Sequence, residues 1–194
     1  MSARTSRRPV PLHSRRRTIG QTGGVRYLTI VRHAKSTPAS PGESDFDRHL
    51  SGRGRRQCAQ LRAWASDVQS LGQYGPTTAL VSSAVRTVET FERAFAETPF
   101  VVHQEFSELI YNGRREVSAE DLLINLAAID PVTTSLLVVA HNPSVHELVL
   151  SLARETPDSL RERCALGGAY VLALPDDRPI GLARYELVAS FIPD

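Results

Sequence analysis

One segment organises the rest of the chain: Tyr27-Leu28-Thr29-Ile30-Val31-Arg32-His33-Ala34-Lys35-Ser36. Five residues of strand-forming character lead directly into an Arg-His pair, which is followed by a small residue, a cation and a hydroxyl. In open α/β sheets, ligands bind just beyond the carboxyl ends of the strands. An imidazole beside a guanidinium at such a strand end is suited to binding an anion. Since a single histidine after a strand can also be an ordinary loop residue, the other segments must decide between these interpretations.

The composition divides the chain into two parts. It has 194 residues, of which 41% are hydrophobic and 23% charged, enough to bury a core. Residues 1–26 contain seven arginines and no acid, whereas the rest of the chain contains 16 basic and 21 acidic residues. The N-terminal segment is rich in Arg, Ser, Thr, Pro and Gly without apolar periodicity, so it cannot bury enough surface to offset its ordering entropy. We therefore predict a disordered Arg-rich tail, residues 1–25, and one folded domain, residues 26–194.

The tail suggests no definite role. It lacks the apolar region of a secretory signal, and although it resembles a transit peptide in composition, Pro9 and Pro11 interrupt any amphipathic helix. Clustered arginines attract phosphate backbones, but no aromatic residues are interleaved to stack on bases. We therefore do not expect nucleic acid to be the main partner.

The cysteines and the apolar runs indicate neither an oxidising compartment nor a membrane. Cys58 and Cys164 lie far apart and match no metal-binding spacing, so neither a disulfide framework nor a zinc site is expected. No apolar run approaches the ~18–20 residues of a membrane span. These features predict a reduced, cytoplasmic protein without membrane attachment, and they leave the oligomeric state open.

Strands alternate with amphipathic helices along the domain. Ser51 and Ser118 are candidate helix N-caps. Apolar spacings of three and four predict helices from Ser51 to about Ser70, over 84–96, from Ser118 to Ile129, and after His141. Strands are predicted at 78–82, 100–103, 135–140, 169–174 and 182–189, in addition to the first. This alternation predicts an α/β fold with a mainly parallel sheet flanked by helices.

Three of the predicted strands end in related chemistry. The first leads to Arg32 and His33, the second to Arg86, and the strand at 135–140 to His141. If these strands are parallel neighbours, two guanidiniums and two imidazoles converge at one edge of the sheet. Arginines can hold a phosphoryl group through charge-assisted hydrogen bonds, one histidine can attack phosphorus, and the other can bind its equatorial oxygens. Since Arg and protonated His neutralise these oxygens and no acidic cluster is evident, we expect neither a metal nor another cofactor.

The segments 31–36, 82–86 and 139–143 (Val-Arg-His-Ala-Lys-Ser, Ser-Ser-Ala-Val-Arg and Val-Ala-His-Asn-Pro) resemble the three signatures of the histidine phosphatase superfamily. The Arg-His-Ala-Lys-Ser form, the loop Asp45-Phe46-Asp47-Arg48-His49-Leu50 and the short chain are most similar to its SixA-type branch of phosphohistidine phosphatases. The resemblance extends from about Tyr27 to at least Leu152.

The resemblance implies both a fold and roles for residues. The expected fold is phosphoglycerate mutase-like, in a small version without the large helical insertion of relatives that bind bulky substrates. His33 is implied as the nucleophile that forms a phosphohistidine intermediate. The implied phosphate pocket consists of Arg32, Arg86 and His141. Larger relatives carry Gly after the Arg-His pair, whereas Ala34 stands here, as is usual in the SixA-like branch.

The general acid is the least defined part of the site. Phe106-Ser107-Glu108-Leu109 resembles the Leu-x-Glu segment that supplies the acid in mutase-like relatives, so Glu108 is the first candidate and Glu105 its nearest rival. An equally open interpretation is that Glu108 is a solvated loop carboxylate. SixA-like proteins often lack a clear proton donor, and a phosphoramidate leaving group needs little assistance.

Several polar residues near the signatures have two interpretations. Lys35, the only lysine, faces phosphate or substrate or is a surface charge, and Ser36 donates to phosphate or caps a turn. Arg48 either enters the rim of the site or pairs with Asp45 or Asp47. The remaining candidates are expected in surface or packing roles, with an entrance role also open for the tyrosine: His49, His103, His146 and Tyr111.

Together these patterns predict a metal-independent phosphatase that acts through a phosphohistidine intermediate. The attacking nitrogen of His33 must be unprotonated, so its other ring nitrogen is expected to donate to a backbone carbonyl. A phosphorylated protein or small molecule is the expected partner, and protein phosphohistidine is favoured because the short chain leaves an open site. The alternatives are a phosphatase of small phosphorylated metabolites and a non-catalytic phosphate-binding module.

Overall fold

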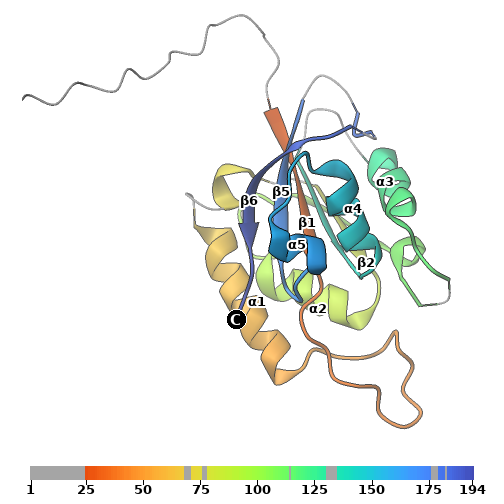
Figure 1. The fold of residues 1–194 in the computed structure, drawn as a ribbon. Coiled ribbons are helices and arrows are strands. Elements are labelled where there is room, and N and C mark those ends of the chain that lie inside the picture. Colours follow the sequence, from red (N-terminus) through yellow and green to blue (C-terminus); the bar gives the residue numbers. More distant parts are fainter. Residues whose placement is uncertain are drawn as a thin grey trace, which may run out of the picture.

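The computed structural model describes residues 25–67, 71–75, 78–113, 115–129, 135–175, 179–181 and 183–194. Their centre is a six-stranded sheet with the strand order β3-β2-β4-β1-β5-β6 (Figure 1). The four strands on one side of the sheet are mutually parallel, whereas β5 is antiparallel to β1 and β6 is antiparallel to β5. The strands are β1 (Val25–Arg32), β2 (Thr78–Ser82), β3 (His103–Ser107), β4 (Leu136–Ala140), β5 (Ala169–Pro175) and β6 (Glu186–Phe191).

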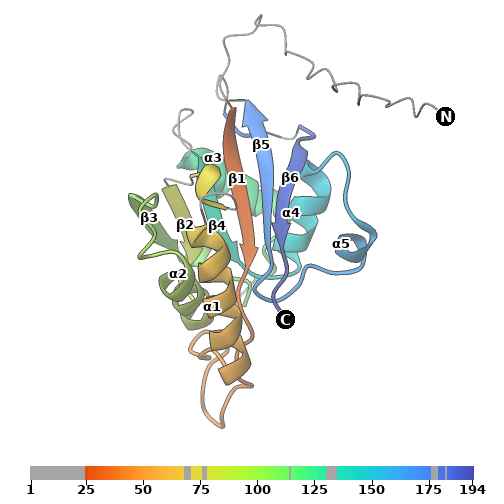
Figure 2. The ribbon, with the colours of Figure 1, turned by 90° about the vertical axis from the view of Figure 1, so that its left-hand side faces the viewer.

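Helices cover both faces of the sheet, which makes three layers (Figure 2). The helices are α1 (Gly52–Ser66), α2 (Val85–Ala94), α3 (Ala119–Ala128), α4 (Ser144–Leu152) and α5 (Asp158–Glu162), with short 3-10 turns η1 (Leu71–Gln73) and η2 (Glu108–Ile110). Helices α1 and α2 pack on one face, and α3 and α4 pack on the other. The predicted α/β class with a mainly parallel sheet is confirmed.

The alternation of side chains along the central strands divides the core into two clusters. Val31 and Val139 pack with Leu61 of α1 and Phe91 of α2 on one face. On the opposite face, the residues that precede them along the strands, such as Ile30, pack with apolar side chains of α3 and α4. Because β2 and β4 are buried on both faces, all five residues of each strand are buried. The ends of these strands are therefore rigidly held.

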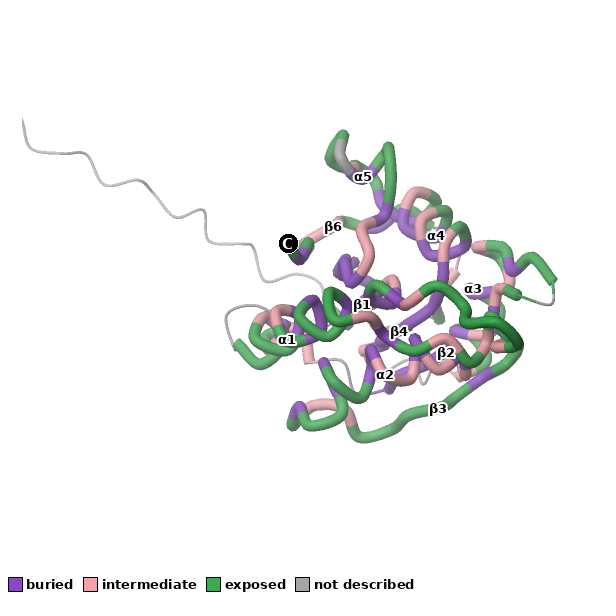
Figure 3. The backbone as a smooth tube through the Cα atoms, turned by 90° about the horizontal axis from the view of Figure 1, so that it is seen from below, coloured by how far each residue is buried: buried purple, intermediate pink, exposed green. Residues whose placement is uncertain are grey.

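Helix starts agree with the caps expected from the sequence. The Ser51 side chain accepts a hydrogen bond from the Gly54 amide at the start of α1. Ser118 and Asp121 form a complete capping box at the start of α3. In Figure 3, burial is concentrated in the sheet, and the segment between β1 and α1 is mainly exposed, from residue 38 to residue 49.

The boundaries of three predicted elements are wrong. The third strand is His103–Ser107 instead of 100–103, because it is an edge strand whose first four side chains are exposed and thus carries no apolar run. Helix α1 ends at Ser66, before the predicted end near Ser70, and β6 begins and ends later than predicted. No pattern in the sequence indicated α5.

Two further expectations concern segments outside the described residues. The predicted disorder of the tail falls on residues 1–24, which are not described. The Asp130-Pro131 pair, which follows the helix predicted from Ser118 to Ile129 and was expected to stop it, also lies outside the described residues. Within the described ranges, no helix is long and apolar enough to cross a membrane.

Candidate active site

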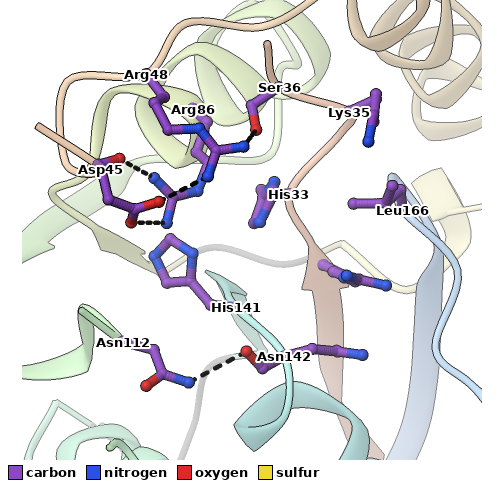
Figure 4. Close-up of a pocket in the computed structure, with 11 residues that line it drawn as sticks. His33, Lys35, Ser36, Asp45, Arg48, Arg86, Asn112, His141, Asn142 and Leu166 are labelled. Carbon is purple, nitrogen blue, oxygen red and sulfur yellow. Dashed lines mark hydrogen bonds and ion pairs between the residues drawn. The ribbon is translucent and has the colours of Figure 1, made fainter. Parts of the chain in front are cut away.

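The carboxyl ends of three parallel strands meet at one pocket. β4 lies between β1 and β2, with Arg32 in register with Ala140, and the His33 amide donates to the Ala140 carbonyl. The topology therefore brings the three motifs together, as the sequence predicted. The pocket has a volume of about 260 Å³ (Figure 4) and is lined by Arg32, His33, Lys35, Ser36, Asp45, Arg48, Arg86, Asn112, His141, Asn142 and Leu166.

His33 is held as a neutral imidazole with one defined free nitrogen. Its Nδ1 lies 2.8 Å from the Ala34 carbonyl oxygen, so Nδ1 carries the ring proton and donates it there. Nε2 then keeps its lone pair. Burial lowers the His33 pKa to about 3; the Ala34 carbonyl opposes this, and the charges of Arg86 and Arg32 add to it. The side chain is therefore uncharged at neutral pH, with Nε2 available as a nucleophile.

His141 faces His33 across the pocket. Their ring centroids are 5.1 Å apart, and Nε2 of His141 lies 2.8 Å from the Ser82 hydroxyl at the end of β2. Nδ1 of His141 is buried and has no hydrogen-bond partner. If Ser82 donates to Nε2, Nδ1 carries the ring proton and can donate it to an oxyanion in the pocket.

The structure does not favour the protonated histidine that was expected to neutralise the phosphoryl oxygens. Burial, followed by the proximity of His33 and Arg86, lowers its pKa well below the ordinary value. His141 is therefore neutral at neutral pH, not positively charged, as long as no anion lies beside it. A dianion bound in the pocket would raise this pKa, because an opposite charge favours the protonated form.

Two arginines approach the pocket from different walls. Arg32 at the end of β1 donates through Nη1 to the Cys164 carbonyl at 2.7 Å, and its Nε is buried without a partner. Arg86 in the first turn of α2 is only 4% exposed. Its two Nη atoms donate to the backbone oxygen of Asp45 at 2.5 Å and to its carboxylate at 2.9 Å. Each guanidinium keeps further N–H groups for a ligand, since arginine has five.

The loop after β1 contributes three polar residues to the rim. Lys35 is exposed and lines the pocket, whereas Ser36 is buried. Arg48 donates to the Ser36 hydroxyl at 2.8 Å and to the Asp45 carboxylate at 2.6 Å. Both interpretations of Arg48 therefore hold, because it lines the rim and also pairs with Asp45. Ser36 accepts a hydrogen bond from Arg48 and forms an isolated bridge with Leu50.

Neither predicted acid lines the pocket. Glu108 is the exposed first residue of η2, and Glu105 is exposed on β3. The carboxylate that does line the pocket is Asp45. Burial would raise the Asp45 pKa, but hydrogen bonds from Arg48 and Tyr111 and the charge of Arg86 outweigh it and lower the pKa to about 2. Asp45 is thus ionised at neutral pH and has no proton to donate.

Several site residues were not predicted. Asn112 and Asn142 line the pocket and are joined by a hydrogen bond from the Asn112 amide to the Asn142 carbonyl. Tyr111, left open between entrance and packing, donates to the Asp45 carboxylate at 2.9 Å and packs its ring against His141. Asp45 and Asn142 stand inside the recognised motifs, so those motifs could have indicated them; nothing in the sequence indicated Asn112.

The other histidines in the described part of the chain lie outside the pocket, as expected. His49 is exposed and pairs with Glu89 at 2.9 Å, and His103 is exposed on β3. His146 contacts the Leu160 carbonyl through Nε2. Over the described ranges, no group of three or more His, Cys, Asp and Glu side chains is arranged to hold a metal ion.

The pocket can hold a small multiply charged oxyanion. Four cationic side chains line the pocket around the neutral His33: Arg32, Lys35, Arg48 and Arg86. A tetrahedral oxyanion held by them would present its central atom to Nε2 of His33. Such charge-assisted donors, fixed before the reaction, are what displacement at phosphorus requires from a protein.

The chain is similar in fold to several solved structures. A putative phosphohistidine phosphatase SixA from Nakamurella multipartitia shares 24% identity over 88% of this chain and 97% of that one, with a TM-score of 0.69. A putative phosphohistidine phosphatase SixA from Agrobacterium tumefaciens shares 26% identity over 87% and 98%, with a TM-score of 0.67. The protein histidine phosphatase SixA complexed with tungstate shares 20% identity over 86% and 97%, with a TM-score of 0.65. No family model and no curated protein sequence matches the chain.

Proposed function

We propose that the chain is a SixA-like member of the histidine phosphatase superfamily and that it hydrolyses phosphorylated substrates through a phosphohistidine intermediate on His33. One observation carries this proposal. The hydrogen bond from Nδ1 of His33 to the Ala34 carbonyl leaves Nε2 unprotonated in a pocket lined by Arg32, Arg86 and His141. A buried neutral imidazole among guanidiniums is suited to attack a phosphoryl group and poorly suited to any cationic ligand.

The reaction proceeds in two displacements. In the first, the Nε2 lone pair of His33 attacks phosphorus, the bond to the leaving group breaks, and the leaving group takes up a proton from solvent. In the second, water attacks phosphorus and the P–Nε2 bond breaks, which releases inorganic phosphate and one proton and restores His33. Arg32, Arg86 and the Nδ1–H of His141 hold the equatorial oxygens in both steps.

We propose that the reaction needs no metal ion. The charge that Mg²⁺ would supply in other phosphoryl-transfer enzymes comes here from the four cationic side chains of the pocket. In this scheme Lys35 approaches the substrate from the open side. Ser36 acts through Arg48, to which it is hydrogen-bonded.

Protein phosphohistidine is the substrate class that the site favours. Leu166 is the only apolar side chain among the described lining residues, so the pocket offers little to recognise beyond the phosphoryl group. The pocket carboxylate, Asp45, is ionised and cannot protonate a leaving group. An imidazole leaving group needs less protonation than an alkoxide, so a phosphoramidate suits this site better than a phosphate ester. A SixA relative of the same fold binds tungstate, a tetrahedral oxyanion like phosphate.

A substrate panel tests the proposal. The wild type and His33→Ala are assayed without added metal and with a chelator on a phosphohistidine peptide, a phosphoserine peptide and a sugar phosphate. His49→Ala is the control, since His49 is exposed outside the pocket. We expect the wild type and His49→Ala to turn over the phosphohistidine peptide and His33→Ala to show no turnover. Preference for the sugar phosphate would favour the metabolite alternative, and binding without turnover would favour the non-catalytic module.

A further inference from the structure

Asp45 is a negative charge built into an otherwise cationic pocket. It is the only carboxylate among the described lining residues, and it comes from the exposed loop after β1. One carboxylate oxygen lies 2.6 Å from Nη1 of Arg48, and the other lies 2.9 Å from both Nη2 of Arg86 and the Tyr111 hydroxyl. Figure 4 shows Asp45 beside the two guanidiniums, at the edge of the pocket away from Lys35.

This carboxylate engages a guanidinium that the proposed function assigns to phosphate. Arg86 is buried and directs both Nη atoms to Asp45, one to its carboxylate and one to its backbone oxygen. Arg32, by contrast, donates to a neutral backbone carbonyl. A phosphoryl dianion that binds Arg86 must therefore share this guanidinium with a carboxylate of like charge.

Contacts made by the next residue, Phe46, keep the backbone at Asp45 close to the pocket. The carbonyl of Phe46 accepts a hydrogen bond of 3.0 Å from the Val85 amide at the start of α2. The Phe46 ring packs edge-on against Tyr111, with centroids 4.9 Å apart. Together with the backbone contact to Arg86, these interactions hold the carboxylate beside any bound anion, where like charges repel.

We propose that Asp45 lowers the affinity of the pocket for inorganic phosphate and so promotes product release. The inference rests on the proposed function, in which phosphate is the product of each turnover. The hydrogen bonds of Asp45 position Arg48 and Arg86, while its charge offsets part of theirs. Without that charge, the four cations of the pocket would hold a released dianion longer, and the site would be inhibited by its own product.

Direct titration with inorganic phosphate tests this without depending on turnover. Calorimetry on the full chain compares the wild type with Asp45→Asn and Asp45→Ala, each first checked for an unchanged melting temperature. We expect phosphate to bind about three- to tenfold more tightly in both variants, since one like charge near the anion is removed. The gain in phosphate affinity should be smaller at high salt, because the Asp45 side chain is about half exposed and salt screens its charge.

Asp47→Asn is the matched control. It makes the same change of charge two residues along the loop, but its carboxylate contacts Ser44 and does not line the pocket. We expect its phosphate affinity to equal that of the wild type. Unchanged or weaker binding in Asp45→Asn and Asp45→Ala would overturn the inference and leave Asp45 as a positioning residue only. Absence of turnover in the wild type, together with tighter phosphate binding in the variants, would refute the proposed function and the role in product release, and would leave only the effect of Asp45 on phosphate affinity.

Discussion

The Ser82 hydroxyl lies 2.8 Å from Nε2 of His141, and this contact determines which edge of the imidazole faces the pocket. Ser82 is fully buried at the end of β2, and His141 directly follows β4, so two neighbouring strands fix both partners. The opposite nitrogen, Nδ1, is left without a partner among the described residues. In the proposed reaction this nitrogen donates to a phosphoryl oxygen.

Ser82→Ala should therefore reduce kcat/KM. The loss of one hydrogen bond that fixes the orientation and tautomer of His141 is expected to lower it about tenfold, which corresponds to about 1.4 kcal/mol. Steady-state kinetics on the phosphohistidine peptide measure the change. Ser83→Ala removes the adjacent hydroxyl, which does not line the pocket, and serves as the control. Equal kinetics for Ser82→Ala and the wild type would show that His141 needs no such support.

Glu108→Gln should keep turnover within about twofold, the scatter expected for a surface carboxylate that touches no reacting group. Glu108 is exposed at the start of η2 and does not line the pocket. The rate should be measured on both a phosphohistidine and a phosphoserine peptide. A loss of a hundredfold or more on the phosphoserine peptide alone would instead identify Glu108 as the acid for poor leaving groups.

The stability of the protein should decrease as the pH falls from 7 to 5. The folded-state pKa of His33 is about 3 and its ordinary value is 6.5, so between these values the unfolded chain binds more protons than the folded one. The free energy of unfolding therefore rises with pH in this window, and His33 alone accounts for a difference of roughly 2 kcal/mol. His141, whose pKa is also lowered, adds a change of the same sign.

Urea denaturation at pH 7 and pH 5 measures this dependence. His33→Gln cannot titrate in this range, so its free energy of unfolding should fall less between the two pH values than that of the wild type. An identical fall in both proteins would mean that His33 is not held neutral by burial.

Gly54→Ala should destabilise the junction between the site loop and α1. A Cβ at Gly54 would overlap the carbonyl oxygen of Lys35, which is backbone and cannot turn aside. We expect a loss of about 2–4 kcal/mol in the free energy of unfolding, as for other overpacked positions. Gly52→Ala is the control in the same turn, because a Cβ there meets only the end of the Arg56 side chain, at 3.9 Å. A similar melting temperature for the two variants would contradict this.

The sequence was most informative where rigid elements carry the chemistry. His33, Arg86 and His141 each follow an apolar strand, and the parallel pairing of β1, β4 and β2 brings their motifs together. The strands can be predicted from local apolar patterns. Their convergence follows from the rule that parallel strands carry their ligand-binding ends at one edge of the sheet. The convergence of these residues was therefore predictable, although their catalytic roles stay a proposal.

Contacts made by loops and edges were not predictable in this way. Asp45 reaches Arg86 across 41 positions of sequence, and no periodicity in an exposed loop indicates such a contact. The apolar run at 100–102 predicts a strand at 100–103, but the edge strand β3 begins only at His103 and has mainly exposed side chains. Glu108 was singled out by resemblance alone, and the 3-10 turn of η2 leaves it exposed.

The central claim is that His33 carries the phosphoryl group during turnover. The wild type and His33→Ala are exposed briefly to a phosphohistidine peptide, quenched in alkali to preserve a phosphoramidate, and digested for mass spectrometry. The account predicts one acid-labile phosphate on the peptide that contains His33, absent from His33→Ala. Turnover by the wild type with phosphate on another residue, or with none trapped while His33→Ala stays active, would contradict it.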